Sequence, residues 1–276
     1  MPSNLIRKIT EFAFGSTKDN HMSLPLSGQT ALVTGGSKGI GRAIAERLAA
    51  DGATVALTYN SSKAGADEAV AAIEQAGGHA FALKVELLDA STIAPLFEQL
   101  DAELTKRYGS KTIDIVVNNA GGSGFGGLET ATLESFDAMF GVFVRAPFFI
   151  VQAALSRLAD GGRVINVSSA FATRPSPMAS MYSMAKGSIN TFTHSLAMEL
   201  GPRGITANAV APGWTRTDMN AAVRESAEMV SVIEADTALK RFGEPSDIAA
   251  VVAFLASEEG RWVTGQVIEA SGGYKL

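Results

Sequence analysis

The sequence predicts an α/β protein with a single doubly wound parallel sheet of about seven strands and helices on both faces, the Rossmann type of fold. Two observations lead to this prediction. From residue 30 onward, short apolar strand-like segments alternate with amphipathic helical patterns, which is typical of βαβ units. The first strand-like segment also ends in a glycine-rich turn that runs directly into a helical pattern. In such a sheet, ligands bind at the carboxyl ends of the strands.

The periodicity of the apolar residues places the elements along the chain. Short apolar runs bounded by glycine or polar residues predict strands at residues 30–33, 54–58, 80–85, 113–117, 163–167, 206–210 and 266–269. Apolar residues three and four positions apart predict helices near residues 40–51, 64–77, 91–108, 133–159, 180–201 and 246–257. A chain of 276 residues fits one such domain, which we expect over residues 28–276.

Composition and charge exclude several classes of function. The chain is 46% hydrophobic and 18% charged, which is typical of a globular protein with a large core. A net charge of −5 offers no footprint for nucleic acid or an anionic membrane, and no continuous apolar run reaches the ~18 residues of a membrane span. The chain has no cysteine, and its three histidines lack metal-ligand spacing. We expect no metal, nucleic acid or membrane partner, and a cytoplasmic location.

Residues 1–27 differ from the rest of the chain and are predicted to be an N-terminal extension. Leu5, Ile9 and Phe12 would share one face of a helix. A continuous apolar segment of the kind found in secretory signals is missing, and acidic residues interrupt the basic character of a transit peptide. The sequence assigns no role to this extension.

The turn after the first strand is expected to bind phosphate groups. Glycines let the backbone turn tightly and approach an anion, while the following helix offers free N–H groups and the positive end of its dipole. The expected cofactor contacts of this turn are Gly35, Ser37, Lys38, Gly39, Ile40 and Gly41. A glycine-rich turn without a ligand is the alternative, and it is disfavoured because strand and helix flank the turn as the motif requires.

The end of the second strand favours NADP(H) over NAD(H). An acidic residue at this place would accept hydrogen bonds from the adenosine ribose and favour NAD, but the segment reads Asn60-Ser61-Ser62. Lys38 and Arg42 lie in the region of the phosphate turn, and cations form strong charge-assisted contacts with a 2′-phosphate. Two solvent-exposed cations are the alternative interpretation, so NAD(H) stays open as the cofactor.

An asparagine- and glycine-containing segment follows the fourth strand. Asn118, Ala120 and Gly121 come directly after residues 113–117 and therefore belong to the ligand side of a parallel sheet. Asparagine binds neighbouring backbone groups and tolerates unusual backbone angles at such places. We expect these three residues to contact the cofactor.

A tyrosine and a lysine four residues apart can supply acid–base chemistry. Tyr182 and Lys186 share one helix face at this spacing, and a nearby ammonium lowers the pKa of a tyrosine from its usual value of about 10. Such a tyrosine can protonate a carbonyl oxygen or deprotonate an alcohol. A serine at the end of the neighbouring strand, in Ser168-Ser169, can donate to the same oxygen. Taken alone, a tyrosine–lysine pair also occurs on solvated helix surfaces.

Together, the glycine-rich turn, the asparagine segment and the serine, tyrosine and lysine resemble the short-chain dehydrogenase/reductase family over nearly the whole chain after residue 27. The resemblance implies an NADP-dependent oxidoreductase that transfers a hydride between the cofactor and a carbonyl or secondary alcohol. It makes residues 28–276 a dinucleotide-binding catalytic domain. It makes Tyr182 the catalytic acid/base and Lys186 the residue that holds the nicotinamide ribose. Ser169 orients the substrate oxygen, and the family spacing to the tyrosine selects it over Ser168.

The same resemblance implies further cofactor contacts and an assembly. Glu86 and Leu87 take the place where an Asp-Leu or Asp-Val pair usually meets the adenine, and the segment beside the nicotinamide corresponds to Pro212, Gly213, Thr215 and Thr217. Family members are usually tetramers, so we expect a homotetramer, with a dimer as the alternative. Its interfaces are expected on the helices near 91–108 and 133–159, or 180–201.

One position departs from the family pattern. Many relatives carry an asparagine that holds a water between the lysine and bulk solvent, and this chain has Phe143 there. Because phenylalanine cannot bind that water, we expect the proton supply of Lys186 to differ. A catalytically weak or inactive NADP-binding sensor or scaffold is the alternative function, and it rests on Phe143 alone. The intact serine, tyrosine and lysine favour an active enzyme.

Residues 214–243 are expected to form a substrate lid, as they do in the family. The expected apolar lining is Trp214, Met219, Met229, Val232, Phe125, Phe171 and Met178. This lining predicts a fairly apolar ketone or secondary alcohol as substrate, whereas Arg174 and Arg216 would suit an acidic one. In motif wording, carrier-protein-linked 3-ketoacyl reductases and related carbonyl reductases are the nearest comparison. The sequence does not assign the physiological substrate, the direction or the stereochemistry.

Overall fold

The computed structural model describes residues 24–122 and 126–276. Most of the expected N-terminal extension, with its predicted helical face, lies outside this range, as does Phe125. Leu26 belongs to the expected extension but is fully buried in the core, and its N–H donates to the Asp51 carbonyl at 2.8 Å. The folded domain therefore begins earlier than residue 28.

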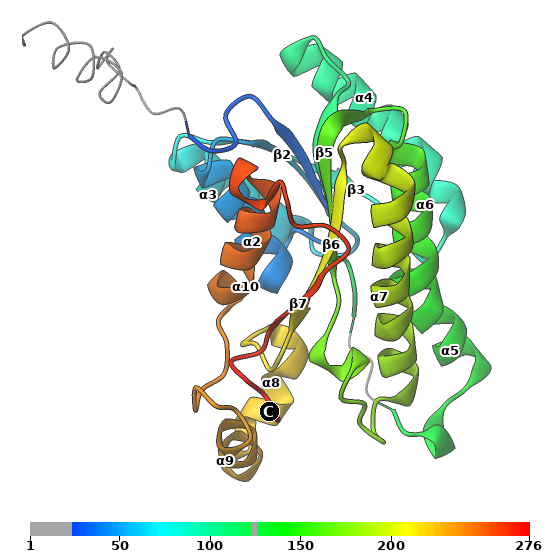
Figure 1. The fold of residues 1–276 in the computed structure, drawn as a ribbon, viewed down its shortest axis with the longest axis vertical. Coiled ribbons are helices and arrows are strands. Elements are labelled where there is room, and N and C mark those ends of the chain that lie inside the picture. The colour runs from blue at the N-terminus through cyan, green and yellow to red at the C-terminus, as the bar shows by residue number, and fades with distance from the viewer. Residues whose placement is uncertain (1–23, 123–125) are drawn as a thin grey trace, which may run out of the picture.

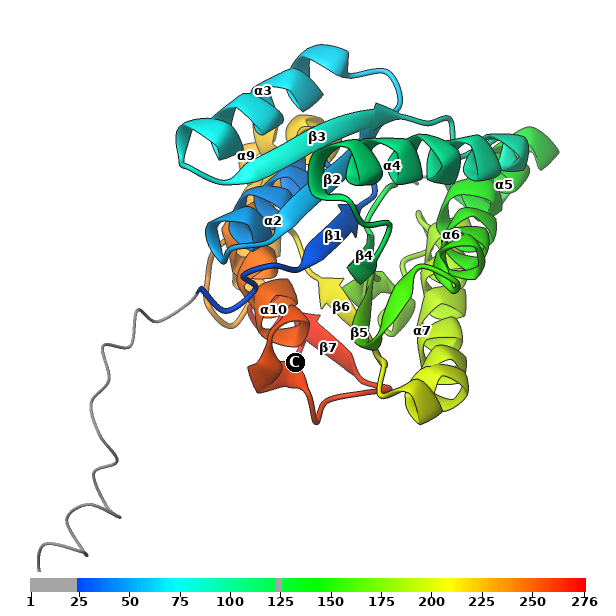
Figure 2. The same cartoon turned by 90° about the horizontal axis from the view of Figure 1, so that it is seen from above.

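Seven parallel strands form one sheet in the order β3-β2-β1-β4-β5-β6-β7, as Figures 1 and 2 show. The strands are β1 (Thr30–Val33), β2 (Thr54–Tyr59), β3 (His79–Lys84), β4 (Ile113–Asn118), β5 (Leu158–Val167), β6 (Thr206–Pro212) and β7 (Val267–Ala270). This order confirms the predicted doubly wound sheet. The chain runs outward from β1 in one direction and then from β4 in the other, so the crevice between β1 and β4 is the place for a ligand.

The boundary between the fourth predicted helix and the fifth strand is wrong in the prediction. The helix was expected to continue to residue 159, but it ends at Ala154, and β5 begins at Leu158 rather than at residue 163. The register between β4 and β5 shifts between Ile113 and Ile115. Gly161, with φ of 77°, belongs to the irregular part of β5, and such a break hides a strand from an apolar pattern.

Helices cover both faces of the sheet (Figures 1 and 2). One face packs against α2 (Gly39–Ala50), α3 (Lys63–Gln75) and α10 (Pro245–Ala256). The other face packs against α4 (Ile93–Tyr108), α6 (Ala146–Ala154) and α7 (Ser180–Leu200). Side chains alternate between the two faces, so Leu32 joins the second core while Ala31 and Val33 join the first. Burial on both faces explains why the strands read as continuous apolar runs.

The segment predicted as one helix from residue 133 contains a π-helical turn. The first part, α5 (Leu133–Phe140), is followed by the π turn η3 (Gly141–Arg145), and α6 continues from there. A π turn adds a residue within the helix and re-aims its side chains, and such turns are frequent at functional sites. This one carries Phe143, which is 5% exposed.

Candidate active site

A cavity of about 470 Å³ opens at the carboxyl ends of the strands, a size within the roughly 300–1,000 Å³ range of small-molecule sites. Nearly all of the expected site residues line it, namely Gly35, Ser37, Lys38, Gly39, Ile40, Gly41, Asn60, Ser61, Ser62, Glu86, Leu87, Ala120, Gly121, Ser169, Tyr182, Lys186, Pro212, Gly213, Thr215 and Thr217. Sequence reasoning did not single out other lining residues, which include Thr58, Tyr59, Leu88, Asn119, Val142, Asp218, Asn220 and Tyr274. Most of these adjoin a predicted contact, but no sequence signal points to Tyr274 from the C-terminal tail.

The phosphate turn needs glycine for two physical reasons. Gly35 and Gly39 have φ of 68° and 56°, in the region that other residues rarely adopt. Gly41 has no room for a side chain, since a Cβ would lie 2.2 Å from the Gly35 carbonyl oxygen and 2.3 Å from Asn119 Nδ2. The turn is therefore packed tightly, with its backbone toward the cavity.

Asn118 and Asn119 divide their roles differently from the expectation. Asn118 lies outside the cavity lining; its side chain is buried and donates to Asn166 Oδ1 at 2.9 Å, which ties β4 to β5. Asn119 lines the cavity, and its amide donates to the carbonyls of Thr34 at 2.9 Å and Gly35 at 3.1 Å. The second asparagine thus fastens the phosphate turn to the end of β4.

The N-terminus of α2 and Lys38 make one end of the cavity electropositive. The first hydrogen bond of the helix runs from the Arg42 N–H to the Lys38 carbonyl at 3.2 Å, so the N–H groups before it have no helical partner. Lys38 itself lines the cavity, whereas Arg42 does not. The Arg42 guanidinium donates to Glu46 at 2.8 Å and to Glu68 at 3.3 Å, and these bonds raise its pKa. Of the two cations expected to meet a 2′-phosphate, the structure places Lys38 at the cavity.

The ends of β2 and β3 are joined by polar side chains at the same end of the cavity. The Asn60 amide donates to the Glu86 carboxylate, which also accepts from the Leu88 N–H at 3.2 Å. Both Asn60 and Glu86 line the cavity. The glutamate that replaces the usual aspartate therefore positions Asn60, beside the place expected for the adenosine.

Ser169, Tyr182 and Lys186 come together in the cavity from the end of β5 and the first turns of α7. A hydrogen bond links the side chains of Ser169 and Tyr182. Ser169 Oγ also accepts from the Phe171 N–H at 3.2 Å, which fixes its rotamer. Lys186 Nζ donates to the Val167 carbonyl at 2.7 Å. The helix pair and the strand-end serine thus form one cluster, with a hydroxyl pair on one side and a buried ammonium on the other.

The pKa values of the tyrosine and the lysine are both set mainly by burial. Burial raises the pKa of Tyr182, and the hydrogen bond with Ser169 opposes this in part. Burial lowers the pKa of Lys186 to about 7. Lys186 does not lower the pKa of Tyr182 here as expected, because Nζ bonds the Val167 carbonyl and lies 5.7 Å from the centre of the Tyr182 ring.

Aromatic rings form a wall at the other end of the cavity. Phe171 meets Tyr182 edge to face with the ring centres 6.3 Å apart, and it meets Trp214 in the same way at 5.8 Å. Trp214 continues to Phe242 at 6.3 Å. Phe171, Trp214 and Met219 line the cavity, as expected. This end is apolar and aromatic, next to Tyr182.

Three other expected members of the apolar lining lie elsewhere. Met178, Met229 and Val232 are exposed side chains outside the cavity. Met229 and Val232 belong to a helix that the sequence analysis did not place, α9 (Ala227–Ala235), and its inward-facing residue is Ile233. The apolar character of the segment was predicted correctly, but the face of the helix was not.

The two arginines considered as partners of an acidic substrate are both engaged. Arg174 forms an ion pair with Glu269 and donates to the Lys275 carbonyl at 3.2 Å. Arg216 pairs with Glu244 at 3.0 Å. Neither arginine lines the cavity. Among the described lining residues of the aromatic end, none is a cation other than Lys186.

The segment 214–243 leaves the sheet after β6 and returns just before α10. It carries α8 (Ala221–Glu225) and α9, which Figure 1 shows beyond the ends of β6 and β7. At its base the two connections run side by side: the Arg216 N–H donates to the Gly243 carbonyl, and the Gly243 N–H donates to the Trp214 carbonyl, both at 2.8 Å. The segment is also attached to the C-terminal tail, because the Ala238 and Leu239 N–H groups donate to the Gly273 and Gly272 carbonyls at 3.2 and 3.0 Å.

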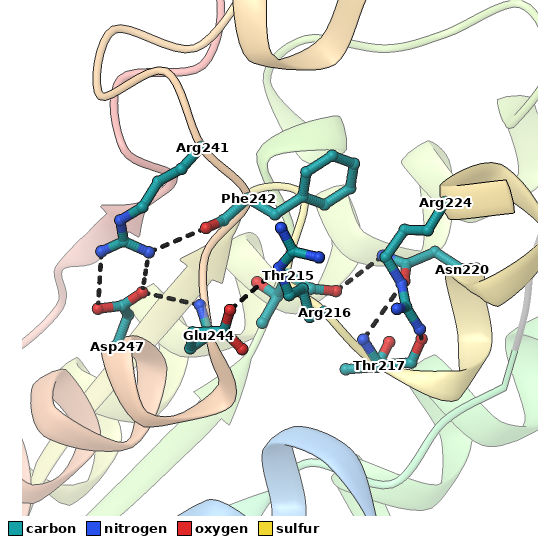
Figure 3. Close-up of polar contacts among 9 residues, drawn as sticks. All are labelled: Thr215, Arg216, Thr217, Asn220, Arg224, Arg241, Phe242, Glu244 and Asp247. Carbon is teal, nitrogen blue, oxygen red and sulfur yellow. Dashed lines mark hydrogen bonds and ion pairs between the residues drawn. The ribbon is translucent and has the colours of Figure 1, made fainter. Parts of the chain in front are cut away.

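Side chains reinforce this base, as Figure 3 shows. Arg241 makes two hydrogen bonds to Asp247, at 2.7 and 3.1 Å, on the first turn of α10. On the other connection, Asn220 donates to the Thr215 carbonyl at 2.7 Å, and Arg224 donates to the Thr217 carbonyl at 3.0 Å. Both connections are therefore held by charged or amide side chains, while the cavity side carries the apolar rings.

A phosphate-binding turn, a buried lysine and a tyrosine–serine pair in one cavity define a dinucleotide-dependent oxidoreductase site. Residues 35–275 match a family model described as enoyl-(acyl carrier protein) reductase. Hydroxynaphthalene reductase arp2 of Aspergillus fumigatus is 40% identical over 257 residues, covering 88% of this chain and 91% of that protein. The chain belongs to the short-chain dehydrogenase/reductase family, as its motifs predicted, and it is an oxidoreductase.

Solved structures of similar chains agree with this assignment. The angucycline C-6 ketoreductase LanV with bound NADP has a TM-score of 0.87 and 46% identity, covering 91% of this chain and 97% of that one. The promiscuous reductase LugOII, which catalyses a keto-reduction in lugdunomycin biosynthesis, has the same TM-score and identity, covering 91% of this chain and all of that one. The glycine-packed turn and the unpartnered helical N–H groups of this chain fit such a dinucleotide.

Proposed function

We propose that the protein is an NADPH-dependent ketoreductase whose substrate is a flat, uncharged, fused-ring aromatic ketone. The observation that carries the proposal is the aromatic wall of Phe171 and Trp214 beside the Tyr182 hydroxyl. Aromatic rings stack on one another in offset and edge-to-face arrangements and contribute beyond their buried area. The ketoreductases and the hydroxynaphthalene reductase among the relatives support a ring ketone. The engaged Arg174 and Arg216 disfavour an acidic substrate.

In the proposed reaction, NADPH, when bound, supplies the hydride. Tyr182 donates its proton to the carbonyl oxygen, and Ser169 donates a hydrogen bond to the same oxygen. The raised pKa of Tyr182 keeps its phenol protonated at neutral pH, which suits an acid in the reducing direction. Lys186 lies with its ammonium toward the cavity lining, where it would bind the nicotinamide ribose. In this proposal, Tyr182 and Ser169 each bind the carbonyl oxygen of the substrate, and Lys186 binds the ribose of the cofactor.

The preference for NADPH rests on Lys38. It lines the cavity beside the positive end of α2, and no acidic residue ends β2, where the ribose would lie. The bound NADP of the LanV structure supports the same choice. We further propose that residues 214–243 act as the substrate lid, because they carry part of the aromatic wall and lie beyond the ends of β6 and β7 (Figure 1).

For the assembly, we infer a homotetramer that uses the outer face of α5, α6 and α7. Leu133–Ala154 is the one helix in residues 24–122 and 126–276 that is long and apolar enough to cross a membrane, yet 39% of its most apolar window is buried in the fold. Its outer side leaves Phe136, Phe148 and Phe149 exposed, and α7 leaves Met184 and Met198 exposed. An apolar patch of this kind marks a protein interface. Light scattering should give a mass above the monomer, and Phe149→Glu should reduce it; a monomeric native chain would refute the inference.

The test of the function is NADPH oxidation with matched ketones. The panel would hold fused-ring aromatic ketones, single-ring ketones and aliphatic ketones of similar size, with 3-ketoacyl thioesters as a fourth group. We expect the fused-ring ketones to have the highest kcat/KM. The Tyr182→Phe variant should lose roughly 10²–10⁴-fold in kcat and keep its NADPH affinity.

Two outcomes would contradict the proposal in different ways. Tight NADPH binding without turnover of any ketone would favour the sensor or scaffold alternative. Turnover of aliphatic ketones or thioesters in preference to ring ketones would keep the reductase and remove the aromatic substrate class.

A further inference from the structure

The ammonium of Lys186 lies against the face of an aromatic ring. Lys186 is 4% exposed, and its Nζ is 4.4 Å from the centre of the Phe143 ring. Among the described residues, the one hydrogen-bond partner of this Nζ is the Val167 carbonyl. A cation over an aromatic face is attracted by the quadrupole of the ring, and the attraction is strongest where water is excluded. The contact is therefore more than filling of space.

Two neighbours, and the π turn that carries the residue, hold the Phe143 ring in place. A Cβ on residue 121 would lie 2.3 Å from Phe143 Cε1, so the ring lies directly on the Gly121 backbone. Tyr182 meets the ring edge to face, with the centres 5.3 Å apart and the planes at 86°. The π turn η3 aims the side chain inward. The ring is thus clamped between the end of β4 and the face of α7 that carries the tyrosine and the lysine.

The surroundings of Lys186 contain no counter-ion among the described residues. Its own helix presents Tyr182, β5 presents the Val167 carbonyl, and η3 presents the uncharged Phe143 ring. Burial is what lowers the pKa of Lys186 to about 7. In that setting, two ring faces favour the charged form beyond the single carbonyl, and the Phe143 ring at 4.4 Å is nearer to Nζ than the Tyr182 ring at 5.7 Å.

We propose that Phe143 is a positioning residue of this enzyme, whose ring holds the Lys186 ammonium charged and aimed at the cavity. The inference rests on the proposed function for its catalytic consequence, but the contact with the ammonium does not. Phe143 performs this role without the hydrogen bond that an asparagine would offer. A charged Lys186 is the form that would bind the nicotinamide ribose most strongly, so the ring acts on the reaction through the lysine and the cofactor it positions.

The direct test is the titration of Lys186 in the cofactor-free protein. The ¹³Cε signal of Lys186, assigned by its loss in Lys186→Arg, would be followed against pH in the native chain and in Phe143→Leu. Leucine keeps an apolar side chain of similar reach but has no ring face. We expect the Lys186 pKa to fall by about one unit in Phe143→Leu and to stay near the native value in Phe143→Tyr.

A fluorinated series removes the objection that leucine changes the packing. Phenylalanine at position 143 would be replaced by its mono-, di- and trifluorinated forms, which weaken the ring quadrupole with little change in size. The Lys186 pKa should fall stepwise with fluorination. A constant pKa across the series and in Phe143→Leu would overturn the inference.

The catalytic consequence is read from the pH profile of alcohol oxidation with NADP. When the ring attraction is lost, Lys186 becomes neutral at lower pH and binds the nicotinamide ribose less well there. The falling limb of kcat/KM for NADP should therefore move to lower pH by about one unit. Phe171→Leu is the matched control, because Phe171 also meets Tyr182 edge to face but does not contact the ammonium. The limb of the pH profile should stay at the native pH in Phe171→Leu, whatever the variant does to the size of the rate. A lowered kcat with an unmoved limb in Phe143→Leu would reduce Phe143 to a packing role.

If the native chain turns over no substrate, the NMR titration still decides this inference. Failure of the proposed function and failure of the contact therefore give different results. If the Lys186 pKa falls in Phe143→Leu but the native chain turns over no substrate, the contact between the ring and the ammonium is supported and its role in catalysis is not.

Discussion

The two ends of the cavity differ in the groups that form them: backbone at one end and side chains at the other. The phosphate end is made of backbone: glycines with positive φ, the N-terminus of α2 and the amide of Asn119 bonded to the turn. The aromatic end is made of side chains from separate parts of the chain, with Phe171 after β5, and Trp214 and Phe242 at the two connections of the 214–243 segment.

This difference teaches which changes each end can accept. A backbone cradle binds the part of the ligand that stays the same for every substrate, and it fails as a whole when a Cβ intrudes. A wall of side chains can be altered ring by ring without disturbing the cradle. The predictions below test that separation, since damage at one end should be uniform and damage at the other should depend on the ketone.

The largest effect is expected for Gly41→Ala. Its Cβ would lie 2.2 Å from the Gly35 carbonyl oxygen, so the turn must open. Because hydrogen bonds to a charged phosphate are worth about 1.5–3 kcal/mol each, losing one or two of them should lower NADPH affinity by roughly 100-fold, whichever ketone is used. NADPH fluorescence titration would measure it. Gly201→Ala is the control, because no atom lies within 4 Å of a Cβ there. A folded Gly41→Ala protein with native NADPH affinity would show that the close packing of the Gly35–Gly41 turn is not needed to bind NADPH.

Phe171→Ala should damage the other end selectively. Loss of the ring removes the edge-to-face wall beside Tyr182 and opens the space that a flat ketone would fill. We expect kcat/KM for fused-ring ketones to fall by about 10–100-fold, the range for truncated apolar pockets, with NADPH affinity unchanged. Steady-state kinetics on ring and aliphatic ketones would check this, with Phe171→Tyr as the ring-preserving control. An equal loss of kcat/KM for ring and aliphatic ketones would contradict the separate roles of the two ends of the cavity.

Lys38→Ala tests the choice of cofactor at the phosphate end. Removal of a charge-assisted contact should raise the Kd of NADPH by about 10-fold and leave that of NADH nearly unchanged. Arg42→Gln is the matched control, since Arg42 is engaged with Glu46 and Glu68 outside the cavity. The two cofactors would be titrated into each variant. Equal weakening of NADPH and NADH would remove Lys38 from the 2′-phosphate.

The smallest effect is expected for Arg216→Gln at the base of the 214–243 segment. The variant loses the ion pair with Glu244 at 3.0 Å and the contact with the Phe242 ring at 5.5 Å. Both charged side chains are about half exposed, so the loss should stay within ~1 kcal/mol and appear in KM for the ketone. Arg261→Gln, which removes the exposed pair with Glu258, serves as control. A change in NADPH affinity would show that the base of the segment also serves the cofactor end.

The parts of the site that could be predicted are those in which local sequence dictates geometry. A strand, a glycine-rich turn and a helix in succession place Gly35–Gly41 at the sheet edge, and a spacing of four places Tyr182 and Lys186 on one helix face. The same reasoning located all seven strands, with errors at β5, where Gly161 interrupts the apolar run.

The parts that could not be predicted depend on contacts between distant segments. The pair Arg174–Glu269 neutralises an arginine that the sequence presented as a substrate ligand, and the partners are 95 residues apart. Asn118 and Asn119 are neighbours in sequence, but β5 takes one amide and the phosphate turn takes the other. Met229 and Val232 lie on a helix whose inward face was set by packing against the domain.

By itself, the sequence determined the sheet, the phosphate turn and the family of the chain, because backbone conformation and side-chain spacing are local properties. Only the tertiary structure decided which cations stay available and which rings build the wall. It alone placed Phe143 under the Lys186 ammonium, because the direction of a side chain at a π turn depends on what the rest of the chain packs against it.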